Sequence, residues 1–465
     1  MRAQEIQGYW WLPGREEKAV PGNLRFSREA GGHLNVLGTL KELDSTFGLF
    51  NPEVILGVST AGKEITLYRC AQSGGRLSFP GIPTSDLYVG AILIGAHVND
   101  AKGMLLGEMS VSYDRLPEWA RLPAFTRTHT TDTGSTFQCS INYAWPPEHR
   151  IDFKGTRIRF VPQLSMEGDS ISRAALLQEL YIEVTPPEPR HLEDYLDGIF
   201  YQVRNFLTLG IGKPVFPMSI KAKLFVTETS DPPPKRPEVE ILFRVPGSPS
   251  EESLHPLFML FAFSDISADY ERVLNNWFEK AEELGPICDL YFGTFYNPTM
   301  YLQSQFLVLA QAVEAFHRRR DDRGYLTDTN FKALLRELQN VVRNYQPGIN
   351  EETMCAFMSR LNYVNEYTLK GRLEELIGGL GALADSVIVD RTQFIKLAGD
   401  TRNYLTHYDK ELKAKSASVE EMHHLVNRLQ FILEMYFLKE IGLSDELVAR
   451  LASRNQKYQQ MRQFA

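Results

Sequence analysis

The sequence predicts a multidomain α+β protein: a β-rich N-terminal region, sandwich-like or barrel-like with a few helices, then an all-α helical bundle. Pro347 is the only one of the 25 prolines after residue 301, and all five tryptophans precede that residue. Since proline is excluded from helix interiors, we expect strands and loops first and helices afterwards. The chain of 465 residues is also too long for one compact core. We therefore expect two domains, residues 1–290 and 300–465.

In the first domain, short runs of β-branched and aromatic residues recur between turn signals. Their number and spacing predict a β-sandwich or an open barrel, open to subdivision near residue 185. Helical periodicity predicts one helix over 191–209 and another over 268–284. The expected strands cover 33–40, 53–58, 64–70, 87–94, 104–113, 136–143, 157–161, 180–184, 220–227 and 238–244. The last two flank a proline-rich loop, 231–237.

The second domain begins with a coiled-coil-like seam, in which apolar residues step by four and three positions. The seam consists of Leu302, Phe306, Leu309, Val313 and Phe316. Further helices are expected over 328–344, 350–364, 369–384, 391–413, 418–441 and 444–463. Pro347 lies in a turn between two of them.

Composition and charge exclude some classes of protein. The longest apolar run, 257–263, is far shorter than the roughly 20 residues of a membrane span. The first five residues lack the apolar stretch that is typical of a signal peptide. The four cysteines are scattered without a Cys-x-x-Cys pair, which is typical of buried thiols in a reducing compartment. We expect a cytoplasmic protein that does not contact membranes.

The net charge of −8 argues against indiscriminate coating of nucleic acid. Residues 301–465 contain 22 Lys and Arg against 21 Asp and Glu, a net charge of +1, so the first 300 residues carry −9. If the protein binds RNA, it must therefore do so through a local basic patch. The best candidate is the cluster Arg318, Arg319, Arg320 and Arg323. A solvated helix end, where cations are favourable, explains this cluster equally well.

The chemistry-bearing motif is Arg402, Asn403 and His407, inside the expected helix 391–413. The arginine fork suits a phosphate, and histidine exchanges protons near neutral pH. These groups suffice to cleave RNA without a metal when the 2′-hydroxyl is the nucleophile. A second Arg-x4-His pattern, Arg28 to His33, contains a Gly-Gly turn signal that would not hold the two side chains in a fixed relation.

On a helical wheel, one side of 391–413 is the expected core-facing stripe. Asn403 falls opposite it, whereas Asp400 and His407 lie between Asn403 and one edge. Arg402 lies toward the other edge, about 140° from His407. One helix therefore does not point both groups at one phosphate, but two copies related by two-fold symmetry would. The alternative is a solvated polar face. The stripe contains Phe394, Leu397, Thr401, Tyr404, Leu405, Tyr408 and Leu412.

Two parts of the chain resemble the ApeA-like branch of the HEPN superfamily. Residues 401–408 match the R-polar-x3-H form of the HEPN ribonuclease motif, and residues 306–318 resemble the first helix of that branch. The N-terminal half is similar to an ApeA N-terminal domain. That similarity rests on residues 8–13, 22–24, 34–38, 62–70 and 112–119, so the resemblance spans nearly the whole chain.

The resemblance implies a HEPN endoribonuclease of bacterial anti-phage defence, of the abortive-infection type. RNA would be cleaved without metal or cofactor, leaving a 2′,3′-cyclic phosphate, at the interface of a homodimer or higher even oligomer of the HEPN bundle. His407 would be the general acid/base and Arg402 the phosphate anchor, and Asn403 would orient the histidine or the phosphate. The N-terminal region would regulate the site and receive a phage-derived trigger.

Several other residues have two interpretations. Glu314 and Asp400 could support the site, although a helix-stabilising glutamate is the simpler interpretation of Glu314. The histidines at 317, 423 and 424 could lie near a phosphate, or be solvated helix residues. Trp10 and Trp11 could stack a base or a sugar, or belong to the core. No phosphate-binding glycine loop, metal-binding histidine pair or serine nucleophile motif is evident.

Two alternative hypotheses remain. The chain could be a HEPN scaffold without catalysis, with a ligand-binding β-domain. Related HEPN toxins can also be silenced by nucleotide addition to a tyrosine near the motif, which would be Tyr404 or Tyr408 here. Both tyrosines fall on the expected core stripe, which argues against this modification.

Overall fold

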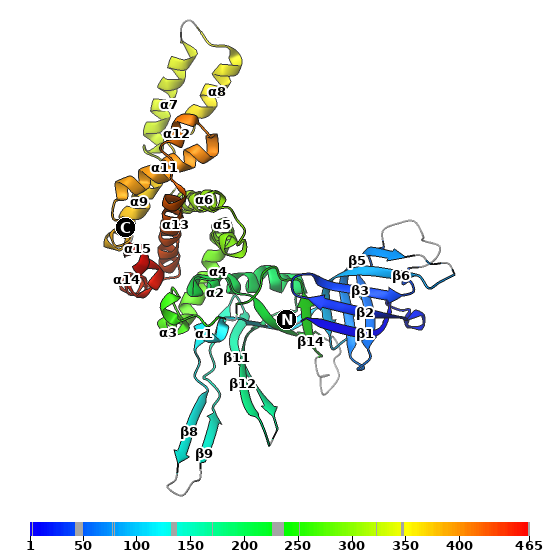
Figure 1. The fold of residues 1–465 in the computed structure, drawn as a ribbon. Helices are drawn as coiled ribbons and strands as arrows, with labels where there is room; N and C mark the ends of the chain where they lie inside the picture. The colour runs from blue at the N-terminus through cyan, green and yellow to red at the C-terminus, as the bar shows by residue number, and fades with distance from the viewer. Residues whose placement is uncertain are drawn as a thin grey trace. The chain divides into compact units, whose positions relative to one another are not determined.

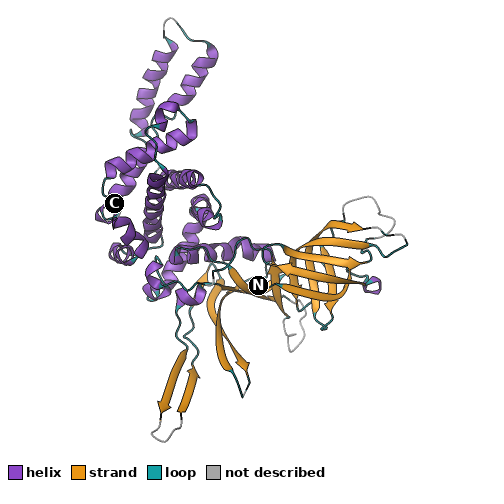
Figure 2. Ribbon diagram, in the orientation of Figure 1, coloured by secondary structure: helices purple, strands orange, loops and turns teal. Residues whose placement is uncertain are grey.

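Strands make up most of the first part of the chain, and helices make up the second (Figure 2). The computed structural model describes residues 1, 3–41, 50–76, 78, 80–131, 137–169, 171–225, 237–250, 252–321, 323–345 and 348–463. The chain divides into two compact units, Met1–Phe278 and Glu279–Ala465. The predicted fold class is confirmed. Parts of the predicted strands 136–143 and 220–227, most of the loop 231–237 and the turn at Pro347 lie outside the described residues.

Six antiparallel strands at the N-terminus close into a barrel. Strand β5 pairs with β4 on one side and with β6 on the other, which completes the ring β6-β3-β2-β1-β4-β5. The barrel strands are β1 (Gln4–Trp11), β2 (Val20–Ser27), β3 (Gly31–Leu37), β4 (Val54–Ser59), β5 (Glu64–Arg76) and β6 (Thr84–Ile94). Closure removes the unpaired edges that an open sheet would expose.

The barrel sheet continues beyond β6 into six further strands, in the order β14, β13, β7, β12, β11 and β10. These strands are β7 (Leu106–Tyr113), β10 (Arg150–Phe153), β11 (Thr156–Gly168), β12 (Ala174–Thr185), β13 (Pro217–Leu224) and β14 (Glu238–Phe243). A separate hairpin pairs β8 (Phe125–Thr131) with β9 (Phe137–Tyr143). The sequence prediction missed β1, β2, β8 and β10. Strand β2 contains a Pro-Gly pair, a turn signal that its pairing with β1 and β3 overrides.

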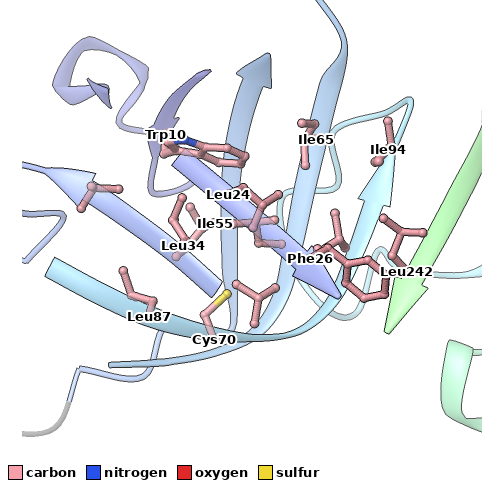
Figure 3. Packing of buried hydrophobic residues seen from close by; sticks show 14 of the residues in the cluster. Trp10, Leu24, Phe26, Leu34, Ile55, Ile65, Cys70, Leu87, Ile94 and Leu242 are labelled. Atoms are coloured by element: carbon pink, nitrogen blue, oxygen red, sulfur yellow. The ribbon is translucent and has the colours of Figure 1, made fainter. Parts of the chain in front are cut away.

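The barrel is filled by aliphatic side chains around Trp10, which is fully buried (Figure 3). A Cβ atom at Gly57 would collide with the Trp10 ring, so the glycine makes room for the indole. Trp11 is also buried. Both tryptophans therefore belong to the core rather than to a base-stacking surface.

Short helices and two longer ones complete the first unit. The predicted helix 191–209 is present as a π-helical segment, η3 (Asp194–Ile199), followed by α2 (Phe200–Ile211), with a kink at Gly198. Trp119 of α1 (Leu116–Ala120) contacts the rings of Phe160, Phe206, Phe261 and Phe263. The remaining helices are η1 (Glu16–Lys18), η4 (Pro256–Phe258), α3 (Phe263–Ile266) and α4 (Tyr270–Glu283), whose last turn enters the second unit.

The second unit is built around α6 (Leu302–Arg320) and α13 (Val419–Glu440). Residues 431–438 of α13 are all buried, and the α6 seam is buried from Phe306 onward, whereas Leu302 is only half-buried. The other helices are α5 (Gly285–Tyr296), α7 (Asp328–Arg343), α8 (Glu351–Leu361), α9 (Leu369–Leu380), α10 (Ala382–Asp385), α11 (Arg391–His407), α12 (Lys410–Lys413), α14 (Asp445–Arg454) and α15 (Gln456–Gln463). The expected helices at 369–384 and 444–463 are each divided in two.

All four cysteines are free, but they differ in exposure. Burial raises the pKa of the Cys70 thiol to about 12 and that of Cys288 to about 12. Cys139 and Cys355 are exposed, so the expectation of four buried thiols was wrong for these two. Because the thiolate is the reactive form, only Cys139 and Cys355 are available to a thiol reagent.

Candidate functional site

The motif lies at the C-terminal end of α11. Asp390 caps the helix N-terminus by accepting a hydrogen bond from the Gln393 amide at 2.8 Å. The helix ends at His407, because Tyr408 adopts a left-handed conformation with φ 53° and its amide bonds to the Tyr404 carbonyl. The expected helix 391–413 was therefore too long. A left-handed cap is usually glycine, so nothing in the sequence marked this end.

The buried face of α11 differs from the predicted stripe. Tyr408 is 70% exposed and Tyr404 is half-buried, whereas Asp400, expected between Asn403 and one edge of the stripe, is buried. The placement of Tyr408 on the core stripe was therefore wrong, whereas Tyr404 lies partly toward the core. The argument against modification of Tyr408 disappears with it. The buried residues of α11 are Phe394, Ile395, Ala398, Gly399, Asp400, Thr401 and Leu405.

Two polar contacts fasten the middle of α11 to its neighbours. Asp400 accepts a hydrogen bond from Lys370 Nζ of α9 at 2.7 Å. The Thr401 hydroxyl, which is fully buried, accepts a hydrogen bond from the Ala417 amide at 2.9 Å. Asp400 is thus part of the bundle's internal packing. These contacts fix the rotation of α11 and hence the directions of the groups that follow.

Arg402 is held against α6. Its guanidinium lies 3.6 Å from Glu314 Oε1 and 3.5 Å from Asn403 Oδ1. The Arg402 side chain is 36% exposed and that of Glu314 24% exposed, so the cation is supported from one side and open on the other. The structure brings Glu314, Arg402 and Asn403 together.

His407 is the last residue of α11 and is exposed. Within the described residues its imidazole has no hydrogen-bond, ion-pair or ring partner, and no such contact joins it to Arg402. Both imidazole nitrogens are free to meet a substrate. One chain thus presents a supported cation and a separate, unengaged proton-transfer group.

The candidate basic patch on α6 is largely neutralised within the second unit. Arg318 pairs with Glu366 at 2.7 Å, and Arg323 pairs with Asp321. Arg320 lies 3.3 Å from Glu440 and over the Tyr436 ring. Arg319 donates to the Glu283 carbonyl. The sequence shows the four arginines but not the groups with which they pair.

The remaining histidine candidates lie in different environments. His317 is not solvated but buried, with Nδ1 accepting from Arg372 at 3.0 Å and Nε2 donating to Glu375 at 2.7 Å. His317 thus bridges α6 and α9. His423 is exposed. His424 is half-buried beside Arg428 in a cavity of about 190 Å³ between α11 and α13.

The second Arg-x4-His pattern is structurally different from the motif. Arg28 lies in the turn between β2 and β3 and donates to the Pro217 carbonyl at 2.9 Å. His33 is on β3, edge-on to the Tyr88 ring. The Gly-Gly pair begins β3 rather than forming the turn. No helix positions these two groups.

A larger cavity lies in the first unit, with a volume of about 360 Å³. Its wall is formed by η3, α2 and strands β7, β13 and β14. Four aromatic residues and several aliphatic ones line it, with Arg204, Arg244 and Asp197 as the charged groups. The Arg204 guanidinium lies over the Tyr201 ring, 5.3 Å from its centre.

Two family models match this chain. The model of ApeA N-terminal domain 1 matches residues 5–277, which is more than half of the chain. The chain belongs to the ApeA family. An Apea-like HEPN model matches residues 307–447 of this ApeA-family protein and includes the whole of α11. The comparison with curated proteins found no match, and neither did the comparison with solved structures.

Family membership places the chain in an anti-phage HEPN effector family. Across the residues that the structure describes, this ApeA-family protein has no helix long and apolar enough to span a bilayer. The same residues include no group of three His, Cys, Asp or Glu side chains placed to hold a metal ion.

Proposed function

We propose that this ApeA-family protein is an anti-phage endoribonuclease that cleaves RNA without a metal, using Arg402 and His407 from two copies of the chain. The observation that carries the proposal is the arrangement at the end of α11. There a supported guanidinium and an unengaged imidazole lie on one exposed helix end of an Apea-like HEPN domain. Loss of RNA cleavage on replacing His407 tests it.

The chemistry follows from these groups. A His407 imidazole accepts the proton of a ribose 2′-hydroxyl, and the 2′-oxygen forms a bond to phosphorus. The bond from phosphorus to the 5′-oxygen breaks, and an imidazolium returns a proton to that oxygen. The products are a 2′,3′-cyclic phosphate and a 5′-hydroxyl. Arg402 stabilises the extra negative charge on the phosphoryl oxygens, for which its planar fork is suited.

The need for two copies follows from helix geometry. Five residues at about 100° each separate Arg402 from His407 by about 140° around α11. Since α11 is one uninterrupted helix from 391 to 407, no bend brings the groups together. Two helices related by a two-fold axis can place the arginine of one beside the histidine of the other.

A non-catalytic HEPN scaffold is the alternative function. The half-buried pair of Arg402 and Glu314 would then be a purely structural contact. The scaffold requires no free imidazole, so substitution of His407 would be without effect on RNA in vitro and in cells.

Glu314 is a positioning residue in this proposal, because it contacts Arg402 rather than the substrate. We expect Glu314→Gln to lower kcat by up to about five-fold with little change in KM, since a partly exposed pair contributes up to about 1 kcal/mol. Steady-state cleavage of a labelled RNA measures both constants. Asp385→Asn, which removes the Arg391 pair at 2.6 Å, is the matched control. An effect on KM alone, or an equal effect of the control, would contradict this role.

In this proposal the first unit regulates the ribonuclease site. Its cavity of about 360 Å³ is within the size range of small-molecule binding sites. Its aromatic lining suits a planar ring. The cavity lining contains two arginines and one aspartate, and this net positive charge favours an anionic ligand. We therefore propose that the trigger is a small molecule with an aromatic ring and an anionic group, the chemistry of a nucleotide.

Thermal unfolding with each ribonucleoside mono- and triphosphate tests this ligand class. We expect at least one nucleotide to raise the Tm, because a ligand that binds only the folded state stabilises it. Arg204→Ala should remove the shift, whereas Arg127→Ala, on the exposed β8 hairpin, should not. Absence of a shift with every nucleotide, or a shift that survives Arg204→Ala, would rule out this class.

A further inference from the structure

Tyr408, the first residue after the motif helix α11, has φ 53° and ψ 32°. Glycine adopts this left-handed conformation at low cost, whereas other residues adopt it with steric strain. Burial does not offset the strain, because Tyr408 is 70% exposed. Within the part of the chain that the structure describes, its side chain has one partner, the ring of Tyr404, 5.6 Å away between centres. Packing therefore does not explain an aromatic residue at this position.

The exposed ring lies beside the proposed proton-transfer group. Tyr408 directly follows His407, and consecutive Cα atoms are about 3.8 Å apart. Tyr404, one turn earlier on α11, is half-buried and meets the Tyr408 ring edge-on. Tyr404 thus supports the Tyr408 ring on one side, while most of that ring stays open to a ligand.

Residues 408–417, which we call the lysine segment, are fixed beside the motif. Their helix, α12, lies next to the end of α11 (Figure 1). Asp409 caps α12 by accepting a hydrogen bond from the Glu411 amide at 2.8 Å. At the far end of the segment, the Ala417 amide donates to the Thr401 hydroxyl at 2.9 Å. Since Thr401 is two turns before the end of α11, both ends of the segment are attached to the turns that carry the motif.

The lysine segment presents unneutralised cations. Its lysines, all exposed, are Lys410, Lys413 and Lys415. None of their ammonium groups forms an ion pair with a residue that the structure describes. Lys410 and Lys413 lie within about 60° of one another around α12, whereas the half-buried Leu412 is about 160° from Lys410. Three lysines against two carboxylates give the segment a net charge of +1, and the arginines of α6 lack such free cations.

We propose that the substrate of this site is single-stranded RNA, with the base at the cleaved bond stacked on Tyr408 and the backbone held by the lysine segment. This inference rests on the proposed function, because the ribose of that base must meet His407. An aromatic ring beside unpaired cations is the usual combination in surfaces that bind single strands. The bases of a duplex stack on one another and do not reach such a ring. Function then accounts for the strained, exposed tyrosine.

Binding of an end-labelled single-stranded RNA that contains 2-aminopurine tests the stacking. The parent is the full chain with His407→Ala, which leaves the probe uncut. Tyr408→Ala should raise Kd about 5- to 150-fold, the contribution of one stacked base, whereas Tyr408→Phe should keep the parent's Kd. Binding should quench 2-aminopurine fluorescence in the parent but not in Tyr408→Ala. Tyr363→Ala, which removes another exposed ring of the second unit, is the matched control and should bind like the parent.

Two comparisons separate stacking from a structural role of the ring. The same RNA annealed to its complement should bind the parent and Tyr408→Ala with equal Kd. Tyr408→Gly should weaken single-strand binding as much as Tyr408→Ala does, but its Tm should be no lower than that of the parent, because glycine adopts the left-handed backbone without strain. A lower Tm in Tyr408→Gly would show that the ring holds the fold together and would overturn the proposal.

The salt dependence of Kd tests the lysine segment. Lys410→Gln, Lys413→Gln and Lys415→Gln together should lower the slope of log Kd against log salt by about 2, since each phosphate contact on a single strand contributes about 0.7. An equal loss of charge on α7 is the control and should leave the slope unchanged. Its three exposed cations are Lys332, Arg336 and Arg343, each replaced by glutamine.

The outcomes distinguish this inference from the proposed function. An unchanged Kd in Tyr408→Ala, an equal loss in Tyr408→Phe or Tyr363→Ala, an equal salt slope in the two triple variants, or a parent that binds no RNA would overturn it. If the wild type nevertheless cleaves RNA, the proposed function stands without this surface. Binding through Tyr408 by a wild-type chain that never cleaves RNA would refute the proposed function alone.

Discussion

Replacement of His407 by alanine is expected to lower RNA cleavage by about 10²- to 10⁴-fold, the contribution of positioned proton transfer. The imidazole is exposed and has no partner within the described residues, so the fold should be unaffected, within about 0.5 kcal/mol of unfolding free energy. Arg402→Ala should cause a loss of similar size, because the developing phosphoryl charge loses its fixed cation.

The measurement has two parts. Purified wild type and variant are compared for cleavage of a labelled RNA, with the 2′,3′-cyclic phosphate identified at the new ends. Cells under phage challenge are compared for growth and for sequenced RNA ends. His33→Ala is the matched control, since that histidine belongs to the other Arg-x4-His pattern and lies on a barrel strand. Full cleavage and toxicity in His407→Ala would refute the role assigned to His407, whereas absence of cleavage by both the wild type and the variant would favour the scaffold.

The division of the chain into strands and helices could be predicted from the sequence because proline acts locally. Its exclusion from helix interiors places the change near residue 301 without any tertiary information. The seam of α6 was predictable for a similar reason. Apolar residues at steps of four and three lie on one side of a single helix, so the pattern can be recognised without knowing its neighbours. Barrel closure was not predictable, because β1 meets β4 and β3 meets β6 through pairing between strands that are not consecutive in the sequence.

The errors around the site share one physical cause. The end of α11 at His407 depends on a left-handed Tyr408, which carries a steric cost that the surroundings must offset. Likewise, Asp400 is buried because Lys370 reaches it from α9. Both outcomes depend on tertiary partners. A helical wheel of α11 alone does not include the residues of neighbouring helices, so it cannot predict either outcome.

Charge on α6 illustrates the same limit. Four arginines in six residues indicate a basic patch when the sequence is considered alone. In the structure, Arg318, Arg320 and Arg323 each meet a carboxylate from another position in the chain. Glu314 shows the opposite case, because a surface glutamate of α6 turns out to contact the motif arginine. The sequence identifies the charged residues, but only the fold shows which residues they contact.

Purified mixed dimers should show whether each site takes its two groups from different chains. We expect a dimer of one Arg402→Ala chain and one His407→Ala chain to retain about half of the wild-type activity. One of its sites then combines both substitutions, and the other combines the intact arginine with the intact histidine. Each variant alone should be inactive. Two affinity tags on co-expressed chains allow isolation of the mixed species before the RNA assay.

The matched control carries the same two substitutions on one chain, paired with a wild-type chain. If the groups come from different chains, each site of this dimer has one defect, so activity should fall to the level of the single variants. If both groups came from one chain, the result would reverse: the wild-type chain would keep half the activity and the first mixed dimer none. Both dimers contain one alanine at 402 and one at 407, so composition and net charge are equal. A difference between them can therefore arise only from which chain supplies each group, the geometry that the 140° separation on α11 requires.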